Sequence, residues 1–447
     1  MSRISKILAD IALKFQYKDL PERAVHQAKR HLLDTIACAI GGYKSDTTRI
    51  LHEVINRFGG RNESTIIGSG SESSCLNAAL VNGAMVRFLD LNDFQTHVSH
   101  PSEVIPPILS LGEALHLPGK TIITSIVAAY EVLGRLTAAI PYSVFSSGGW
   151  NTDLKAGLVI PVVAGKLLNL SKEQIENAIG IAGSRCMVLG ILDAPKEEYT
   201  MAKNLRFPLT AYTGLLAAFL AEKGFTGPRT VFEGQYGFID VVLNGNFDYQ
   251  RLTEDTQDLQ IMYAGLKRFC SCYSTHAHIQ ATLEIVEKYN VQPEDIESVK
   301  IVLNTRTFNH TTDPAKRFPD NKETADHSSY YITAIVLLER MLGPEQYRSE
   351  KYADDRVKEL IKKISICNDP KLDKFYPAAK VDIVLKSGAR YENRVDYPKG
   401  HYSNPLSDDE IAKKLFSLSN HQMSEKQIQE LIDVTYSLEK LDDIHLY

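Results

Sequence analysis

The chain lacks the basic excess that marks a nucleic-acid-binding protein. Its 447 residues hold 50 Lys and Arg against 55 Asp and Glu, a formal net charge of -5 at pH 7. Because phosphate backbones require a basic surface, this balance argues against nucleic acid as a partner. A small anionic ligand is still compatible with it, since such a ligand needs only a local cluster of Lys and Arg.

Long apolar runs are also absent. No uncharged apolar run reaches about 18 residues, so no membrane span is expected. The N-terminus places Ile4, Leu8 and Ile11 at helical spacing and includes Asp10, which predicts an amphipathic helix and no signal peptide. The 6 cysteines are few for this length and predict reduced thiols in a cytoplasmic protein.

Sequence motifs for nucleotide binding and serine hydrolysis are missing too. Neither G-x-x-x-x-G-K-[ST] nor G-x-G-x-x-G opens a helix after a strand, so no nucleotide cofactor is predicted. No G-x-S-x-G is present, which removes the nucleophile elbow of a serine hydrolase.

Apolar residues recur at helical spacing through the first 260 or so residues, without a convincing strand pair. This pattern predicts an all-helical domain over residues 1–263, with the glycine pair Gly41-Gly42 as the C-cap of a helix at about 21–41. Residues 401–447 return to helical spacing, beginning with a capping box at Ser407 and Glu410. We expect this C-terminal segment to pack on the first domain.

Between these helical segments the composition changes. Residues 299–303 alternate apolar and polar side chains as a half-buried strand does, and residues 380–397 predict a hairpin that turns at Ser387-Gly388. Helices are predicted at about 276–289 and 328–342. Residues 264–400 therefore predict a smaller α+β domain inserted into a mainly α protein.

The first cluster of polar side chains follows a helix predicted at about 76–89. Asp90, Asp93, His97 and His100 occur within eleven positions, just after an apolar run. A carboxylate beside an imidazole can orient or charge it, which general acid-base catalysis near neutral pH requires. The structural alternative is that the carboxylates cap a helix end and His97 is solvated.

Three further clusters could carry chemistry. Lys203 and Arg206 begin a long helix, where backbone N–H groups and fixed charge favour an anion, although such side chains are commonly solvated. A third cluster has the spacing C-x-C-x3-H-x-H: Lys267, Arg268, Cys270, Cys272, Tyr273, His276 and His278. This spacing differs from the C-x2-C and H-x3-H of zinc sites, so no metal is predicted.

The fourth cluster, DHSSYY, contains Asp326, His327, Tyr330 and Tyr331 at the start of a helix. The alternative to a catalytic role here is an N-cap followed by core aromatic residues.

Seven segments, taken in order, resemble the MmgE/PrpD family. They are HLLDTIACAIGG, LDLND with HPSEVIPP, GKLLNLS..QI.NAIGIAGS, MAKNLRF....GLLAAFLAEKGFTGP, KRF....STHAHI, DHS..Y and KGHYSNPLS. The resemblance extends over residues 5–440. The family includes 2-methylcitrate dehydratases, cis-aconitate decarboxylases and iminodisuccinate epimerases.

The resemblance implies that the α+β domain is a lid, that the protein is a homodimer and that a cofactor-free site lies between the domains. It assigns catalytic roles to Asp90, His100, Lys203, Lys267 and Tyr331. The predicted substrate-binding residues are Asp93, Thr96, His97, Asn151, Arg206, Arg268, Cys272 and His276, of which Arg206 and Arg268 rest on charge alone.

Four departures from the family pattern bear on the reaction. One is HPSEV at residues 100–104, where the dehydratases have HPSDN. Phe94 stands where many members have a threonine, so the threonine hydroxyl is missing unless Thr96 supplies it. Asn151 and Cys272 stand where the decarboxylases have histidines. A cofactor-independent hydro-lyase of a small polycarboxylate, similar to 2-methylcitrate dehydratase, needs the fewest imidazoles and is the first prediction. The alternatives are a decarboxylase of the cis-aconitate type, an epimerase or isomerase of the iminodisuccinate type, and a catalytically idle carboxylate-binding protein.

Overall fold

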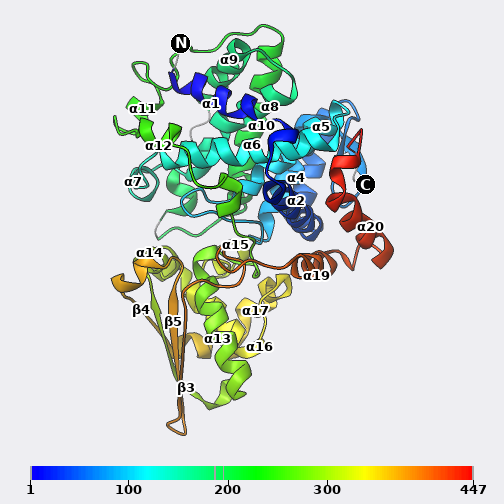
Figure 1. The fold of residues 1–447 in the computed structure, drawn as a ribbon. Helices are drawn as coiled ribbons and strands as arrows, with labels where there is room; N and C mark the ends of the chain where they lie inside the picture. The colour runs from blue at the N-terminus through cyan, green and yellow to red at the C-terminus, as the bar shows by residue number, and fades with distance from the viewer. Residues whose placement is uncertain (1–2, 186–187, 195, 445–447) are drawn as a thin grey trace.

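The computed structural model describes residues 3–185, 188–194 and 196–444, which form a mainly helical protein with a small α+β part (Figure 1). The predicted fold class is confirmed. In Figure 1 the helical part occupies the upper half, and the α+β part lies below it. The brown and red segment at the C-terminal end of the chain runs back along the helical part.

The helical part contains twelve α-helices from the first 253 residues and two from the C-terminal segment, counted over the described residues. They are α1 (Arg3–Lys14), α2 (Glu22–Gly42), α3 (Asp46–Phe58), α4 (Cys75–Phe88), α5 (Ile105–Ala114), α6 (Gly119–Ala138), α7 (Ser143–Ser146), α8 (Ala156–Leu167), α9 (Lys172–Gly183), α10 (Arg206–Glu222), α11 (Phe238–Val241), α12 (Tyr249–Thr253), α19 (Asp408–Ser419) and α20 (Glu425–Tyr436).

The glycine pair at the end of α2 has a different role from the predicted one. Gly41 and Gly42 both lie inside the helix, and Tyr43 is the C-cap. A Cβ atom on Gly42 would lie 2.3 Å from the carbonyl oxygen of Met85 in α4. Gly42 therefore allows α2 and α4 to approach closely, which a sequence pattern does not separate from a cap.

A short strand pair corrects the prediction of an all-helical first domain. β1 (Ser64–Ile66) and β2 (Ser71–Ser73) pair antiparallel across a turn in which Gly68 and Gly70 have φ of 88° and 67°. Strands of three residues are too short to show the period-2 alternation on which the sequence argument relied.

Helix α6 is long and apolar enough to cross a membrane by length and composition. However, 89% of its most apolar 18-residue stretch is buried inside the protein. It is a core helix of the helical part. The five cysteines in the described part of the chain are free thiols, while Cys186 lies outside the described residues.

The α+β part consists of a four-stranded sheet with helices beside it (Figure 1). Its strands are β3 (Ile296–Leu303), β4 (Ile364–Asn368), β5 (Ala379–Leu385) and β6 (Arg390–Val395), in the order β4-β3-β5-β6. Its α-helices are α13 (His276–Tyr289), α14 (Thr305–Thr311), α15 (Lys322–Ala325), α16 (Ser329–Glu339), α17 (Ser349–Ala353) and α18 (Asp355–Lys363).

The predicted hairpin is confirmed as β5 and β6, with Gly388 at φ 86° in the turn. The pairing of β3 with β5 is also antiparallel, whereas β3 and β4 are parallel. Strand β4 was not predicted, because it follows α18 without a turn signal and only two residues of Ile364–Asn368 are isoleucine.

Two hydrophobic cores meet where the first polar cluster lies. One core joins the helices of residues 4–266 to residues 406–444. The other belongs to the α+β part but also includes Leu89 and Leu91. Since these two leucines flank Asp90 and belong to the second core, packing against the α+β part fixes that residue at the junction. The boundaries at residues 263 and 400 stay predictions.

Candidate active site

Asp90 comes directly after α4 in a loop with unusual backbone geometry. Its N–H donates to the carbonyl of Arg87 at 3.0 Å, and its φ is 48°. His97 and Ser99 in the same loop also have positive φ, at 66° and 85°. The left-handed conformation costs a residue with a side chain about 1–2 kcal/mol, so this loop is held in a conformation that local preferences oppose.

The Asp90 carboxylate is fully buried among cations. Lys267 Nζ lies 2.7 Å from Oδ1 and donates to the main-chain oxygen at 2.8 Å, while Arg87 Nη1 lies 3.2 Å from Oδ1 and Lys203 Nζ 3.6 Å from Oδ2. Burial alone raises the pKa of Asp90, but attraction by Lys267, Lys203 and Arg87 outweighs it and holds the pKa well below its usual range. Asp90 is thus ionised at neutral pH.

His100 is arranged as a neutral base. Its Nδ1 lies 2.9 Å from the main-chain oxygen of Asp93, which can only accept, so Nδ1 carries the proton. Its Nε2 is turned toward Asp90 Oδ1 at 3.5 Å. Burial, together with Arg87 and Lys267, lowers the pKa of His100 well below its usual value. The Nε2 lone pair is therefore available to take a proton.

Asp93 positions this loop. Its Oδ1 accepts from the N–H of Ser102 at 2.8 Å, and its Oδ2 accepts from the Tyr130 hydroxyl at 2.6 Å and lies 3.1 Å from His31 Nδ1. With both oxygens engaged and the side chain fully buried, Asp93 is placed to hold His100 in position. This placement speaks against the predicted substrate contact.

Lys203 connects Asp90 to a second carboxylate, which the α+β part contributes. Its Nζ lies 2.9 Å from Asp326 Oδ1, and Lys322 Nζ lies 2.8 Å from Asp326 Oδ2. The His327 ring nitrogen Nδ1 also bonds to Asp326. Burial lowers the pKa of Lys203, although Asp326 and Asp90 act against that shift.

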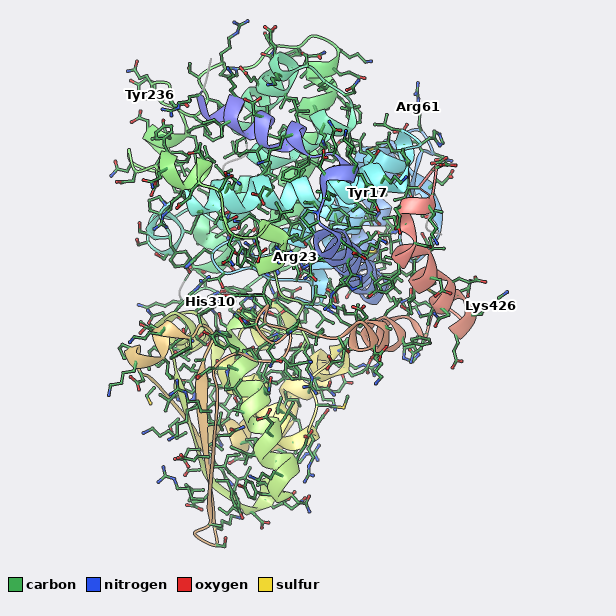
Figure 2. All side chains as sticks on the ribbon, viewed as in Figure 1. Tyr17, Arg23, Arg61, Tyr236, His310 and Lys426 are labelled. Carbon is green, nitrogen blue, oxygen red and sulfur yellow. The ribbon has the colours of Figure 1, made fainter. Side chains whose placement is uncertain are left out.

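Cys272 lies beside two imidazoles of the α+β part. Its Sγ is 3.6 Å from Nδ1 of His310, a residue of α14 that Figure 2 shows at the junction of the two parts. One ligand atom from each of Cys272, His310 and His327 lies within 4.8 Å of the others. Tyr199 lies next to His310. Its hydroxyl is 3.4 Å from His310 Nε2 and 3.0 Å from Lys316 Nζ.

Additional cations line the edge of the cluster. The Arg306 guanidinium lies over the rings of Tyr142 and Tyr376, at 4.6 and 4.5 Å from the centroids, and 3.5 Å from His97 Nδ1. His97 is exposed here, next to the half-buried Thr96.

Lys155 is a buried cation near this edge. Its Nζ donates to Thr137 Oγ1 at 3.0 Å and to the carbonyl of Val98 at 3.2 Å. Burial lowers its pKa to about 7. Unlike the lysines around Asp90, it donates to hydroxyl and carbonyl oxygens and not to a carboxylate.

Arg206 and Asn151 meet at a third carboxylate. Asn151 Nδ2 donates to Asp193 Oδ2 at 2.8 Å, and its Oδ1 caps the N–H of Asp153 at 3.0 Å. The Arg206 guanidinium binds Asp193 and lies 3.1 Å from Asp153. Asn151 therefore acts as a cap in this network, where the family pattern led us to expect a substrate contact.

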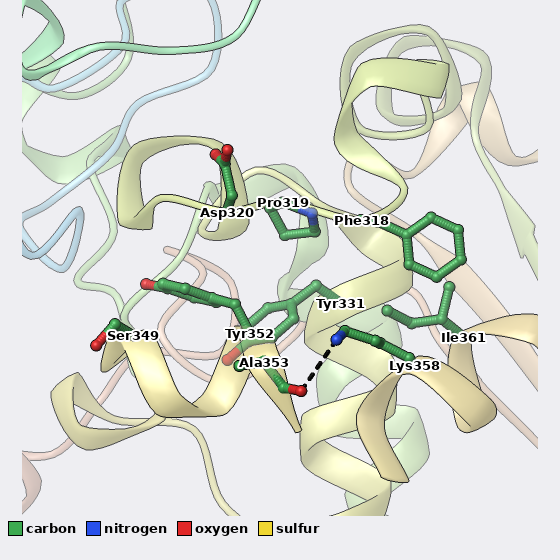
Figure 3. Close-up of a pocket in the computed structure, with 9 residues that line it drawn as sticks. All are labelled: Phe318, Pro319, Asp320, Tyr331, Ser349, Tyr352, Ala353, Lys358 and Ile361. Atoms are coloured by element: carbon green, nitrogen blue, oxygen red, sulfur yellow. Dashed lines mark hydrogen bonds between the residues drawn. The ribbon is translucent and has the colours of Figure 1, made fainter. Parts of the chain in front are cut away.

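Three predicted site residues form no hydrogen bond or ion pair with Asp90 among the described residues. The Tyr331 hydroxyl donates to the carbonyl of Gln346, and the ring lines a pocket of about 360 Å³ that opens elsewhere on the α+β part (Figure 3). Arg268 is exposed and lies over the ring of Phe269. His276 is buried against the rings of Phe269 and Tyr273.

Phe94 is also explained by packing. Its ring stacks on Tyr273 at a centroid distance of 3.1 Å, and its backbone pairs with Gly265. A Cβ atom on Gly265 would lie 2.6 Å from the Phe94 ring. The aromatic residue that replaces the family's threonine thus fills space between the loop and the start of the α+β part.

Several residues of this cluster were not among the predicted sites. Asp326 and His327 belong to the DHSSYY segment but are not among the predicted site residues. No sequence pattern predicted a role for Arg87, Glu103, Lys155, Asp193, Tyr199, Arg306, His310, Lys316 and Lys322. The DHS segment carried the one available signal, a carboxylate next to an imidazole. The others stand apart in sequence, and only the fold brings them together.

The fold and site define a class of protein in which a large helical part and a small α+β part enclose a buried group of lysines, carboxylates and imidazoles. The MmgE/PrpD N-terminal domain matches residues 6–250, and the MmgE/PrpD C-terminal domain matches residues 269–439. The chain belongs to the MmgE/PrpD family, as its motifs predicted.

Two kinds of enzyme occur among its relatives. Cis-aconitate decarboxylase of Aspergillus terreus (strain NIH 2624 / FGSC A1156) is 25% identical, with 95% of this chain and 91% of the relative covered. The Homo sapiens cis-aconitate decarboxylase is 26% identical, with 95% and 89% covered. The 2-methylcitrate dehydratase of Escherichia coli (strain K12) is 24% identical, with 83% and 80% covered. Decarboxylases and dehydratases are both lyases, which supports an enzyme of the lyase kind for this chain.

Proposed function

We propose that the protein is a cofactor-independent lyase that acts on a small polycarboxylate. The observation that carries this proposal is the excess of cations in the cluster. The cations are Arg87, Lys155, Lys203, Arg206, Lys267, Arg306, Lys316 and Lys322. The carboxyl groups nearby are Asp90, Asp93, Glu103, Asp153, Asp193 and Asp326. Glu103 is neutral at pH 7, because burial raises its pKa to about 8. A ligand with two or three carboxylates would balance this surplus of positive charge.

Our first candidate reaction is dehydration. His100 Nε2 removes the proton next to a substrate carboxylate, and the lysines Lys203 and Lys267 stabilise the negative charge that develops there. Burial strengthens that stabilisation, because little water competes for the charge. General acid-base catalysis and charge stabilisation typically contribute factors of about 10²–10⁴ and 10²–10³ in rate.

The family resemblance gives Tyr331 a catalytic role, and a tyrosine hydroxyl could protonate the leaving hydroxyl. The Tyr331 hydroxyl donates to the carbonyl of Gln346. We therefore assign the protonation of the leaving hydroxyl to Tyr199. Burial raises the pKa of Tyr199 well above its usual value, so its hydroxyl keeps its proton at neutral pH.

Decarboxylation is the second candidate. The sequence disfavours decarboxylation, because Asn151 and Cys272 replace two imidazoles of the decarboxylases. In the fold, His310 and His327 lie beside Cys272, so two imidazoles stand at that edge from other segments. Such a group could protonate carbon as CO₂ leaves.

Substrate access requires a movement between the two parts of the protein. Lys203 and Lys267 are fully buried, and Asp326 on the α+β part closes over Lys203. We propose that the α+β part acts as a lid, as the family resemblance implied. The homodimer and the cytoplasmic location stay predictions.

NMR in D₂O with purified protein separates these reactions. 2-Methylcitrate, citrate, cis-aconitate and iminodisuccinate are each followed over time. Dehydration yields an alkene, decarboxylation loses a carboxyl carbon, and epimerisation exchanges deuterium at carbon without elimination. An unchanged spectrum for all four compounds would reject the lyase for those substrates and favour a protein that only binds carboxylates.

A pair of lysine variants ties the activity to the site. Lys203→Met removes the charge between Asp90 and Asp326 and should lower turnover by about 10²-fold or more. Lys223→Met is the matched control, since Lys223 is exposed just beyond the end of α10. Thermal unfolding of both variants shows whether Lys203→Met still folds. Equal turnover in the two variants would contradict the proposed role of Lys203.

A further inference from the structure

Cys272, His310 and His327 come from three separate segments, and their spacing fits a metal ion. Zinc binds cysteine at about 2.3 Å and histidine at about 2.1 Å in a tetrahedral arrangement. Two such ligands are about 3.6 Å apart, by simple trigonometry from these bond lengths. Cys272 Sγ and His310 Nδ1 are 3.6 Å apart, and all three ligand atoms lie within 4.8 Å of one another.

The imidazoles are also oriented as metal ligands are. Metal-binding histidines commonly bond through the second ring nitrogen to a carboxylate or another polar group, which fixes the ring. His327 does so through Nδ1 to Asp326, which leaves Nε2 facing inward, 3.7 Å from Asp90 Oδ2. His310 does so through Nε2, which lies 3.4 Å from the Tyr199 hydroxyl. Both free nitrogens are thus on the side of Cys272.

Two carboxylates lie beside the three residues. Asp90 and Asp326 form a second group of potential ligands with His327. Asp90 Oδ2 is buried and accepts no hydrogen bond from the described residues, though Lys203 Nζ lies 3.6 Å away. With a cysteine thiolate added, three negative groups face the cations Arg87, Lys203, Lys267, Lys316 and Lys322. Zn²⁺ would therefore compete with these cations for Asp90 and Asp326.

We propose that Cys272, His310 and His327 bind one Zn²⁺ ion through Sγ, Nδ1 and Nε2, with the fourth position open. The cysteine loses its proton on binding, since the thiolate is the ligand. The site differs from the C-x-C-x3-H-x-H spacing of the sequence. Among the described residues, the groups of potential ligands do not include Cys270, His276 or His278.

Zinc binding does not depend on the proposed lyase activity. If that activity is present, Zn²⁺ should inhibit it, because the ion occupies His327 and Cys272 beside Asp90 and Lys203. This inhibition would be reversed by a chelator. A protein that turns over no polycarboxylate would still be expected to bind the ion.

Titration of the purified full-length chain tests the site. After treatment with a chelator and its removal, Zn²⁺ is titrated by calorimetry, and Co²⁺ is titrated by absorption. We expect one ion per chain and a thiolate-to-cobalt charge-transfer band, which reports a cysteine ligand directly. Cys272→Ser should abolish that band and weaken Zn²⁺ binding by about 100-fold or more.

Two further variants distinguish the site from general metal binding. Cys367→Ser is the control, because Cys367 is half-buried on β4, outside the groups of potential ligands. It should keep the cobalt band and the zinc affinity. Tyr199→Phe removes the hydroxyl beside His310 and should weaken binding by about 10-fold.

Thermal unfolding in the presence of Zn²⁺ guards against variants that fail to fold. The wild-type chain and Cys367→Ser should gain stability with added Zn²⁺, whereas Cys272→Ser should not. Binding of one ion without a charge-transfer band would overturn the proposal. So would a Cys272→Ser variant that folds and keeps the wild-type affinity for Zn²⁺.

Discussion

Glu103 provides a prediction whose size can be worked from the structure. It lies in the 3-10 helix Pro101–Val104, next to the Asp90 loop, and its side chain is 1% exposed. Neither carboxyl oxygen has a hydrogen-bond partner among the described residues, and Arg87 Nε is 4.0 Å away. Burial raises the pKa of Glu103 to about 8, against the opposing attraction of Arg87. The side chain is therefore neutral in the folded protein at pH 7.

The unfolded chain releases this proton near pH 4.5, so the folded state binds one more proton than the unfolded state between that pH and about 8. Stability must then fall as pH rises through this window. One pKa unit corresponds to about 1.36 kcal/mol. Raising the pH from about 6 to about 8 should cost the wild-type protein about 2–3 kcal/mol of unfolding free energy through Glu103.

Glu103→Gln keeps the size and shape of the side chain but does not titrate. Urea unfolding of both proteins at the two pH values, followed by the fluorescence of Trp150, the sole tryptophan, gives the comparison. The variant should gain about 2–3 kcal/mol relative to wild type as the pH rises. Glu254→Gln, at an exposed position, should gain nothing. Parallel pH profiles for wild type and Glu103→Gln would refute the reasoning.

Three other variants test separate features. Lys155 has its pKa lowered to about 7 by burial, so stability should rise with pH between about 7 and 10, and Lys155→Met should remove that rise in urea unfolding. Tyr331→Phe should keep turnover within about 2-fold, because the hydroxyl lies apart from Asp90; a loss of about 100-fold would restore its predicted role. Gly42→Ala should lower stability by about 1–3 kcal/mol, measured against Gly343→Ala, where a Cβ atom meets nothing closer than 3.6 Å.

The sequence predicted the fold well where local signals are strong. The capping box at Ser407 and the turn at Gly388 are both present in the structure. It failed where a residue serves a distant contact. Gly42 looked like a helix end because its close neighbour, the Met85 carbonyl, is 43 positions away in sequence.

The candidate site shows the same division. Asp90, His100, Lys203 and Lys267 were predicted from family motifs, and the structure brings them together. Tyr331 shares a motif with Asp326 and His327 but faces the other way, since the first turn of a helix sends successive side chains in different directions. His310 carried no signal of its own, because an isolated histidine on a short helix is unremarkable in sequence.

Lys414 in α19 connects the far end of the chain to the site. Its ammonium group donates to Asp34 at 2.6 Å, to the carbonyl of Leu91 at 2.7 Å and to the carbonyl of Lys267 at 3.1 Å. During synthesis, at about 5–20 residues per second, every other residue around Asp90 has left the ribosome before Lys414 is made. The nascent chain therefore carries an uncompensated Asp34 and an uncovered face of α2 until α19 has been made. Premature termination before α19 should yield a product that chaperones and proteases recognise, even though nearly all of the site residues are in it.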